Sequence, residues 1–330
     1  MNKSTRAKKT PLPKPLAFEQ KARTALAHFD AAESFLIGVS GGRDSVALLH
    51  FLVSCGFKNL VVCHLDHSLR GRASSADARF VANLAEKYNL RSVVKKYDVR
   101  KFAAKKKQSL ETAARDARYA FFARVSVEEK CNGVFLAHHA DDQVETFLFN
   151  LFRGAGTFGL GGMQAETVRN TDGATLHLLR PLLGIWRAEI DEYIHTHKLK
   201  FRDDATNREL QNTRSKMRCE IIPAIEKALG RDVRKSIWKT AEILRAQQEF
   251  LRQSICVDSA ELSVSELRAM PDALQSALIH QWLQKNGVPD ISFDLVQSVR
   301  ALIDPATTHA KVNLPGARHV RRRAKKLFVE

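Results

Sequence analysis

The stretch that decides the fold runs Phe35-Leu36-Ile37-Gly38-Val39-Ser40-Gly41-Gly42-Arg43-Asp44-Ser45. Its first five residues form a short apolar run, which is typical of a buried parallel strand. Gly41 and Gly42 lack a Cβ, so the backbone can turn sharply there and approach a ligand closely. Ser40, Asp44 and Ser45 are residue types that begin and cap helices. The stretch therefore predicts a strand, a tight turn and a helix start, where unpaired amides and the helix dipole favour a phosphate.

The turn differs from the better-known phosphate-binding loops. No lysine follows the glycines, so the turn is not a Walker A loop, and the Gly-x-Gly-x-x-Gly of a dinucleotide-binding fold is also absent. Ser-Gly-Gly-x-Asp-Ser resembles the PP-loop of the ATP pyrophosphatases. That resemblance implies a loop that holds the β and γ phosphates of ATP while an acceptor oxygen attacks the α phosphate. An ordinary strand-to-helix turn with capping residues is the alternative interpretation.

Composition points to a polyanionic partner. The 330 residues include 53 Lys and Arg against 36 Asp and Glu, a net charge of +17. The basic excess recurs in three separate segments, at 91–107, 208–218 and 318–326. Such dispersion suits a large, extended anion such as RNA better than one small ligand.

Cysteine usage and hydropathy narrow the class of protein further. The five cysteines are scattered, and none lies in a Cys-x-x-Cys pair: Cys55, Cys63, Cys131, Cys219 and Cys256. This argues against a zinc ribbon, an iron–sulfur cluster or a redox pair, and a reducing cytoplasm fits best. No apolar run approaches the length of a membrane span, so we expect no membrane association.

Strand-like and helical patterns alternate through residue 153, which predicts βαβ units and a Rossmann-like parallel sheet. The expected strands cover 35–39, 60–65, 92–97 and 134–137, and the expected helices cover 45–54, 75–89, 109–130 and 141–153. Ligands of such sheets bind beyond the carboxyl ends of the strands. The Ser-Gly-Gly turn, the segment 64–67 and the segment 138–142 all fall at such ends.

The rest of the chain is expected to be mostly helical. A flexible loop at 154–162 and an irregular segment to residue 183 precede helices at 185–197, 215–229 and 231–254. Short helices and a small β hairpin, with strands at 311–314, 319–322 and 327–329, complete the chain. We expect a disordered basic tail over 1–16, a phosphate-binding α/β domain over 17–230, and a helical linker with a small C-terminal domain over 231–330.

A second chemistry-bearing segment is His138-His139-Ala140-Asp141-Asp142-Gln143-Val144-Glu145. Asp142 and Glu145 have capping-box spacing, which explains part of the pattern structurally. Capping explains neither the paired histidines nor both aspartates. Two carboxylates beside a phosphate site can hold Mg²⁺ or an ammonium group.

Two further segments are less specific. Arg115 and Arg118 are neighbours on one helical face, where they would form either a phosphate clamp or a solvated surface. His64 and His67 point to opposite faces of a strand, so a structural role is favoured for them.

Together these segments resemble the tRNA(Ile)-lysidine synthetase family, from about residue 34 to 229 and again, weakly, at the C-terminal hairpin. The matching pieces are 40–45, 64–70, 114–119, 138–146, 151–156, 159–163, 180–183, 204–207, 212–214, Arg218 and Pro223. Longer members of the family carry a further C-terminal domain, so this sequence is expected to be a short form.

The resemblance implies a substrate, a reaction and a set of residues. ATP and Mg²⁺ would bind at the PP-loop, with Asp44 as a metal ligand: Ser40, Gly41, Gly42, Arg43, Asp44 and Ser45. The C2 oxygen of the wobble cytidine in a tRNA(Ile) with a CAU anticodon would attack the α phosphate. The ε-amine of free lysine would then attack C2 of the adenylated cytidine, giving lysidine, AMP and pyrophosphate.

Other residues are assigned by the same resemblance. The candidates for catalysis or lysine binding are Asp141, Asp142, Glu145, Arg115, Arg118 and His138. The resemblance also implies that 17–230 is the ATP-binding catalytic domain and that the small domain within 231–330 binds tRNA. The candidates for tRNA binding are Arg153, Arg187, Arg208, Arg214, Arg322 and Arg323. The oligomeric state is left open, a homodimer included. A tRNA thiolase, an amidotransferase-type synthetase and a non-catalytic RNA-binding protein are the alternatives.

Overall fold

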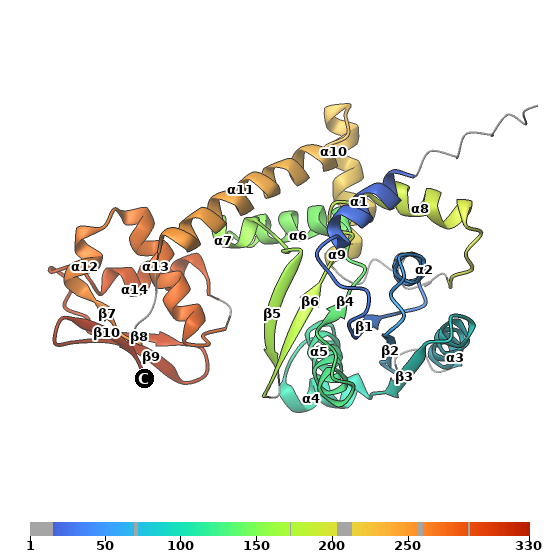
Figure 1. The fold of residues 1–330 in the computed structure, drawn as a ribbon. Helices are drawn as coiled ribbons and strands as arrows, with labels where there is room; N and C mark the ends of the chain where they lie inside the picture. Colours follow the sequence, from blue (N-terminus) through green and yellow to red (C-terminus); the bar gives the residue numbers. More distant parts are fainter. Residues whose placement is uncertain (1–15, 69–71, 172, 203–212, 256–259, 290) are drawn as a thin grey trace, which may run out of the picture. The chain divides into compact units, whose positions relative to one another are not determined.

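The computed structural model describes residues 16–68, 72–171, 173–202, 213–255, 260–289 and 291–330 (Figure 1). The chain divides into two compact units that interleave in sequence. The first unit consists of Met1–Asp142 and Gln164–Glu209, and the second of Gln143–Met163 and Leu210–Glu330. The predicted tail over 1–16 lies outside the described residues, apart from its last residue.

The first unit is built on a six-stranded sheet in the order β3-β2-β1-β4-β6-β5. All neighbouring strands are parallel except the edge strand β5, which runs antiparallel to β6. The strands are β1 (Phe35–Gly38), β2 (Leu60–Asp66), β3 (Arg91–Lys96), β4 (Val134–Phe135), β5 (Glu166–Thr171) and β6 (Ala174–Leu179). The predicted Rossmann-like α/β class is confirmed, and four of its strands were expected.

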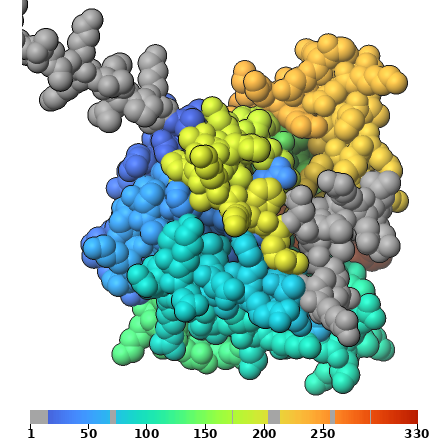
Figure 2. Space-filling model, turned by 90° about the vertical axis from the view of Figure 1, so that its right-hand side faces the viewer, coloured from blue at the N-terminus to red at the C-terminus, as the bar shows by residue number. Residues whose placement is uncertain are grey.

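Helices cover both faces of this sheet. They are α1 (Ala17–Leu26), α2 (Arg43–Ser54), α3 (Arg72–Lys87), α4 (Val99–Lys106), α5 (Leu110–Glu128) and α8 (Arg187–Thr196). One apolar core joins residues of α1, α2, α3 and α8 to the sheet, and another joins α5 to the opposite face. Figure 2 shows the yellow-green atoms of α8 beside the blue atoms of α2.

The expectation of an irregular segment before residue 183 is wrong. Residues 166–179 form the β5–β6 hairpin, and β6 pairs with β4 in parallel. Leu176 and Leu178 alternate with polar residues and are buried, whereas β5 is an edge strand with a polar sequence. A polar edge strand lacks the apolar alternation that sequence analysis relies on. The helices α1 and α4 were also not predicted.

Helix α6 (Ala140–Phe152) begins in the first unit and continues in the second. The other helices of the second unit are α7 (Thr157–Leu160), α9 (Thr213–Lys216), a π-helical turn (Met217–Ile221), α10 (Ile222–Leu229), α11 (Arg234–Ser254), α12 (Val264–Ala269), α13 (Asp272–Lys285) and α14 (Phe293–Ala301). Its antiparallel sheet has the order β7-β10-β9-β8, from β7 (Leu262–Ser263), β8 (Lys311–Leu314), β9 (Arg318–Arg323) and β10 (Lys326–Val329). The predicted helical region and C-terminal hairpin are confirmed.

The second unit has a core of its own around Trp282 on α13. The indole is fully buried and donates from Nε1 to the carbonyl oxygen of Ala260 at 2.9 Å. Val320 of β9 and Leu327 of β10 pack in the same cluster, so the sheet and the helices share one apolar interior. None of the helices in the described residues is long and apolar enough to cross a membrane.

Candidate active site

The Ser-Gly-Gly turn follows β1 at the carboxyl end of the sheet, as predicted. Gly41 has φ +89°, a left-handed backbone conformation that glycine adopts without strain. The hydroxyl of Ser40 accepts from the amide of Gly42 at 3.2 Å, and the hydroxyl of Ser45 donates to the carbonyl of Gly42 at 2.9 Å. The amide of Ser40 also donates to the hydroxyl of Ser45 at 3.2 Å, so the two serine side chains stabilise the turn.

The start of α2 presents backbone donors. The first hydrogen bond of the helix runs from the amide of Val46 to the carbonyl of Gly42, at 3.1 Å. The amides of Asp44 and Ser45 therefore lie in the first turn, where no helical carbonyl can accept from them. Together with the helix dipole, this geometry suits a phosphate group.

Asp44 forms an ion pair that was not predicted. Its Oδ2 accepts from Nη2 of Arg187, the first residue of α8, at 2.9 Å. Its Oδ1 is buried and has no hydrogen-bond partner among the described residues. We had expected Arg187 to lie on a tRNA-binding surface, but its side chain is directed at the PP-loop carboxylate. Because the two residues are 143 positions apart, only the tertiary fold brings them together.

Asp141 and Asp142 are both held by backbone amides. Oδ2 of Asp141 accepts from the amide of Arg187 at 2.9 Å, which ties the start of α6 to the start of α8. Oδ2 of Asp142 accepts from the amide of His139 at 3.0 Å, so Asp142 caps its own helix. These carboxylates lie where the sequence predicted them, beyond the carboxyl end of β4.

His139 was left without a role by the sequence and lies at the centre of these carboxylates. Its side chain is 1% exposed. Its ring nitrogens lie 3.8 Å from Asp44, 3.6 Å from Asp141 and 3.6 Å from Asp142. These distances are longer than hydrogen bonds. The ring instead accepts at Nε2 from Nη2 of Arg187 at 3.3 Å, and the same guanidinium nitrogen donates to Asp44.

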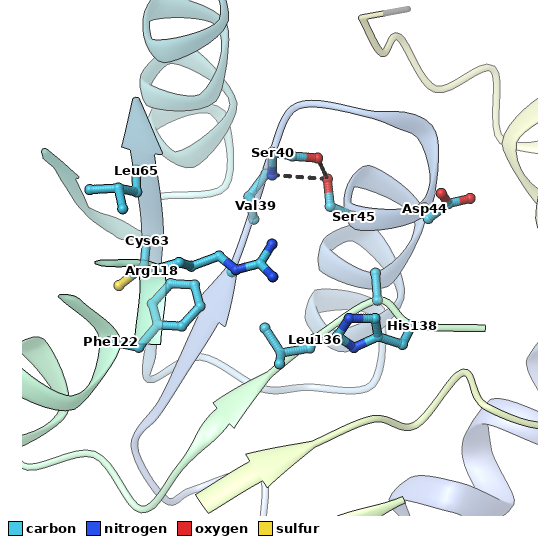
Figure 3. A pocket seen from close by; sticks show the side chains of 12 residues that line it. Val39, Ser40, Asp44, Ser45, Cys63, Leu65, Arg118, Phe122, Leu136 and His138 are labelled. Carbon is cyan, nitrogen blue, oxygen red and sulfur yellow. Dashed lines mark hydrogen bonds between the residues drawn. The ribbon is translucent and has the colours of Figure 1, made fainter. Parts of the chain in front are cut away.

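A cavity of about 190 Å³ opens beside the turn (Figure 3). It is lined by Ser40, Asp44 and Ser45 from the turn, by Arg118 from α5 and by His138 after β4. In Figure 3 the guanidinium of Arg118 points into the space between the turn and His138. The structure thus brings together predicted residues from three separate segments of the sequence.

His138 is neutral at ordinary pH. Burial is the main cause that lowers its pKa to about 3; the nearby Arg118 and Arg180 act in the same direction, and Asp142 opposes them. Nδ1 of the ring is buried and has no hydrogen-bond partner among the described residues. A ring with so low a pKa is a hydrogen-bonding group for a ligand and a poor acceptor for a proton.

The arginine pair predicted on α5 is divided between two environments. Arg118 lines the cavity, whereas Arg115 does not line it, and both guanidinium groups lie over the ring of Tyr119, at 5.6 and 5.3 Å. Burial alone would raise the pKa of Tyr119, but Arg115, Arg118, Arg180 and Arg169 together lower it. The site is therefore backed by a buried ring surrounded by positive charge, which favours a phosphate nearby.

Arg43, expected to bind ATP, directs its side chain away from the cavity. Its Nη1 donates to Oδ1 of Asp191 on α8 at 2.7 Å, and its guanidinium lies over the ring of Phe201. Arg43 can therefore serve the phosphate site only through its backbone.

Glu145 belongs to the second unit and is part of a buried ion pair. Its side chain is 2% exposed. Its two oxygens accept from Nε and Nη2 of Arg218 at 2.6 and 3.1 Å. Arg218 lies in the π-helical turn, a distortion that often marks functional sites. A lysine ammonium at Glu145 would have to compete with this guanidinium. Glu145 was also the expected capping-box partner of Asp142, but its carboxylate pairs with Arg218 instead.

Side-chain amides of α6 form hydrogen bonds to the segment 154–163, most of which was expected to be a flexible loop. Gln143 donates from Nε2 to the carbonyl of Gly161 at 2.9 Å and accepts at Oε1 from the amide of Met163 at 2.8 Å. Asn150 donates to the carbonyl of Gly159 at 2.7 Å. The segment also contains the one-turn helix α7, so the prediction of a flexible loop is wrong.

The remaining tRNA candidates differ in what they contact. Arg153 is exposed, with its guanidinium over the ring of Phe149, and Arg214 is half-buried. The guanidinium of Arg322 donates to three backbone carbonyls, those of Leu302, Asp304 and Thr307. Arg322 is therefore a structural residue of the second unit, whereas its neighbour in sequence, Arg323, is exposed. Arg208 lies outside the described residues.

The donor set at the turn fits a magnesium ion. Magnesium is usually held by one or two carboxylates together with phosphate oxygens and water. Asp44 offers a buried carboxylate oxygen with no other partner among the described residues, at the edge of the phosphate cradle. Within the described residues, no group of three His, Cys, Asp or Glu side chains is arranged to hold a metal ion.

Comparison with known proteins agrees with this geometry. The PP-loop domain family matches residues 15–225, and the TilS substrate binding domain matches residues 262–328. The chain belongs to the tRNA(Ile)-lysidine synthetase family of PP-loop proteins. The resemblance predicted from the sequence is therefore confirmed over both ends of the chain.

Relatives in the family cover most of the chain. A tRNA(Ile)-lysidine synthase of Geobacter sulfurreducens is 38% identical over 302 residues, which are 87% of this chain and 63% of the relative. One of Bacillus subtilis is 36% identical over 77% of this chain and 56% of the relative. The chain spans roughly half to two thirds of the length of the curated relatives it matches.

A solved structure supports the fold alone. The U34-tRNA thiolase NcsA from Methanococcus maripaludis, with its [4Fe-4S] cluster, has a TM-score of 0.53 and 20% identity, over 69% of this chain and 78% of that chain. The four described cysteines of the present protein are free and are not grouped into a metal site within the described residues. The likeness is therefore one of architecture.

Proposed function

We propose that this protein ligates free lysine to C2 of the wobble cytidine of tRNA(Ile) with a CAU anticodon, with cleavage of ATP to AMP and pyrophosphate. The observation that carries the proposal is the family match at both ends of the chain, combined with a cavity lined by the PP-loop, Arg118 and His138. A protein of this kind would act in the cytoplasm, where charged and uncharged tRNA and free lysine are found.

ATP would bind with its β and γ phosphates on the amides at the start of α2. Asp44 would hold Mg²⁺, which supplies charge neutralisation as pyrophosphate leaves. Arg118 points into the cavity and would stabilise the charge that develops on the α phosphate. His138, which stays neutral, would accept a hydrogen bond at one ring nitrogen or donate one from the other, without taking up a second proton.

In the first step the C2 oxygen of cytidine attacks the α phosphorus, and the bond to pyrophosphate breaks. In the second step the lysine ε-amine attacks C2, and AMP leaves with the former C2 oxygen. The amine must be neutral to attack, so a group must take its proton. Asp141 and Asp142, near the turn, would bind the ammonium and accept this proton. Glu145 remains a candidate, in competition with Arg218.

We assign the division of labour along the chain as predicted from the sequence. Residues 17–230 would carry the chemistry, and 231–330 would bind tRNA. Arg153 and Arg214 of the first segment and Arg323 of the second are the candidate phosphate contacts. The cytidine must leave the anticodon stack to reach the cavity. Homodimer formation stays a prediction.

The test is incorporation of label. The protein is incubated with ATP, Mg²⁺, radiolabelled lysine and a tRNA(Ile) bearing CAU, with a methionine tRNA as the control. We expect label in the isoleucine tRNA alone. No label, with ATP still cleaved in a tRNA-dependent way, would point to another nucleophile and favour the thiolase alternative. No ATP cleavage with any tRNA would favour a non-catalytic RNA-binding protein.

A further inference from the structure

A groove larger than the PP-loop cavity runs along α5 in the first unit and has no role in the proposed chemistry. Its volume is about 1020 Å³, and its walls come from β3, α4, α5 and the β5–β6 hairpin. Leu65, near the carboxyl end of β2, lines both the groove and the PP-loop cavity, so the two meet there. From that point the groove runs along α5 to Gly173 and Ala174 at the start of β6. A chain that leaves the cavity past Leu65 would enter the groove.

The segment that contributes Lys95, Tyr97, Phe102 and Lys106 to the groove is strongly basic. Residues 91–107 contain eight lysines and arginines and a single acidic residue, Asp98. Two of the eight have carboxylate partners: Arg91 pairs with Glu129 and Lys101 with Asp98. The other six make no side-chain hydrogen bond or ion pair with any described residue: Lys95, Lys96, Arg100, Lys105, Lys106 and Lys107. All six are exposed.

The floor of the groove is apolar and partly aromatic. Tyr97 and Phe102 line it with their rings 5.6 Å apart, and Phe121 of α5 lines it from below. Lys95 and Lys106 line the same groove. The acidic side chains of the lining are engaged, because Asp116 pairs with Arg169 and Glu128 lies 3.8 Å from Arg124. The positive charge at Lys95 and Lys106 is thus left uncompensated.

We propose that this groove binds the RNA strand next to the nucleotide that enters the PP-loop cavity, with backbone phosphates on Lys95 and Lys106. Unpaired basic side chains beside exposed aromatic and apolar surface are the combination that single-stranded RNA recognises. An acidic protein segment would be attracted by the charge, but its carboxylate side chains, unlike nucleotide bases, would not stack on the aromatic floor. The identity of the RNA as tRNA rests on the proposed function.

The experiment compares two matched pairs of lysine substitutions in the full chain. K95A/K106A removes two charges from the groove. K58A/K130A removes two exposed lysines that precede β2 and β4 and that do not line the groove. Dissociation constants for a tRNA(Ile) transcript with CAU are measured over a range of salt concentrations, and K95R/K106R restores the charge.

Each phosphate contact with a single strand contributes about 0.7 to the slope of log affinity against log salt. For K95A/K106A we therefore expect the slope to fall by about 1.4 and binding at about 0.15 M salt to weaken on the order of tenfold. K58A/K130A and K95R/K106R should bind like the parent protein. An unchanged slope in K95A/K106A, or an equal loss in K58A/K130A, would overturn the proposal.

Two further outcomes separate this proposal from the proposed function. Groove-dependent tRNA binding without lysine incorporation by the parent would leave the groove assigned and refute the ligase function. Lysine incorporation by the parent protein, together with unaltered tRNA binding by K95A/K106A, would support the ligase function and refute the groove proposal. If the variant binds tRNA normally but no longer binds a labelled polyglutamate peptide, the groove is a protein-binding surface and the RNA proposal is refuted.

Discussion

Replacement of Asp44 by Asn separates the metal role of this carboxylate from its structural role. The asparagine oxygen can still accept from Arg187, so the 2.9 Å contact between α2 and α8 can persist without the negative charge. The other carboxylate oxygen, which is buried and without a hydrogen-bond partner among the described residues, becomes an amide nitrogen. An amide nitrogen does not bind Mg²⁺, so we expect the phosphate cradle to lose its metal.

The two consequences differ in size. A hydrogen bond between charged groups contributes about 1.5–3 kcal/mol, and one with a neutral partner about 1 kcal/mol. Because both side chains are partly exposed, at 25% and 31%, the loss of folding stability should be about 1 kcal/mol. Loss of the metal ligand should slow pyrophosphate release at least about 100-fold, which corresponds to about 2.7 kcal/mol in the activation barrier.

The assay is tRNA-dependent exchange of pyrophosphate into ATP, with tRNA affinity measured in parallel. Asp191→Asn is the matched control, because Asp191 is also paired with an arginine but does not line the cavity. We expect Asp44→Asn to lose exchange and keep its tRNA affinity, and Asp191→Asn to keep both. Equal losses of exchange in the two variants, or a loss of tRNA affinity that matches the loss of exchange in Asp44→Asn, would refute the assignment.

Three other predictions follow from single contacts. Glu145→Gln should cost about 3 kcal/mol of unfolding free energy, because it breaks a buried ion pair whose other member, Arg218, is one-third exposed; a double-mutant cycle with Arg218→Gln that shows no coupling would contradict this. The pKa of His138, lowered by burial to about 3, keeps the folded ring neutral while the unfolded chain binds a proton below about pH 6.5. Its contribution to stability is therefore complete above that pH and is lost as pH falls toward 3, by up to about 1.4 kcal/mol per pH unit. In His138→Gln the unfolding free energy, measured by urea titration, should depend less on pH across this range. Arg322→Ala should lower the melting temperature of the second unit, because three carbonyls lose a charged donor, whereas Arg323→Ala should leave it unchanged and weaken tRNA binding; the opposite pattern would exchange their roles.

Much of the first unit could be predicted from local sequence. The apolar run at 35–39, the two glycines and the helix start place a phosphate cradle after β1 by backbone chemistry alone. Strand alternation then brought the segments at 64–67 and 138–142 to the same edge, because parallel strands share the direction of their carboxyl ends. Both features depend on neighbouring residues or on a repeating pattern along the chain, so they can be recognised in a single sequence.

The position of the phosphate cradle after β1, and the sheet edge that holds the candidate site residues, can be predicted from the sequence alone. Which of these side chains contact one another depends on the tertiary structure. Arg187 reaches Asp44 because α8 packs on α2, and Arg218 reaches Glu145 through a π-helical turn that no periodic pattern predicts. The groove beside α5 likewise needs the β5–β6 hairpin, whose polar edge strand leaves no apolar alternation in the sequence. Charge and residue type are properties of each position in the sequence. The Asp44–Arg187 and Glu145–Arg218 pairs instead depend on contacts between residues 143 and 73 positions apart.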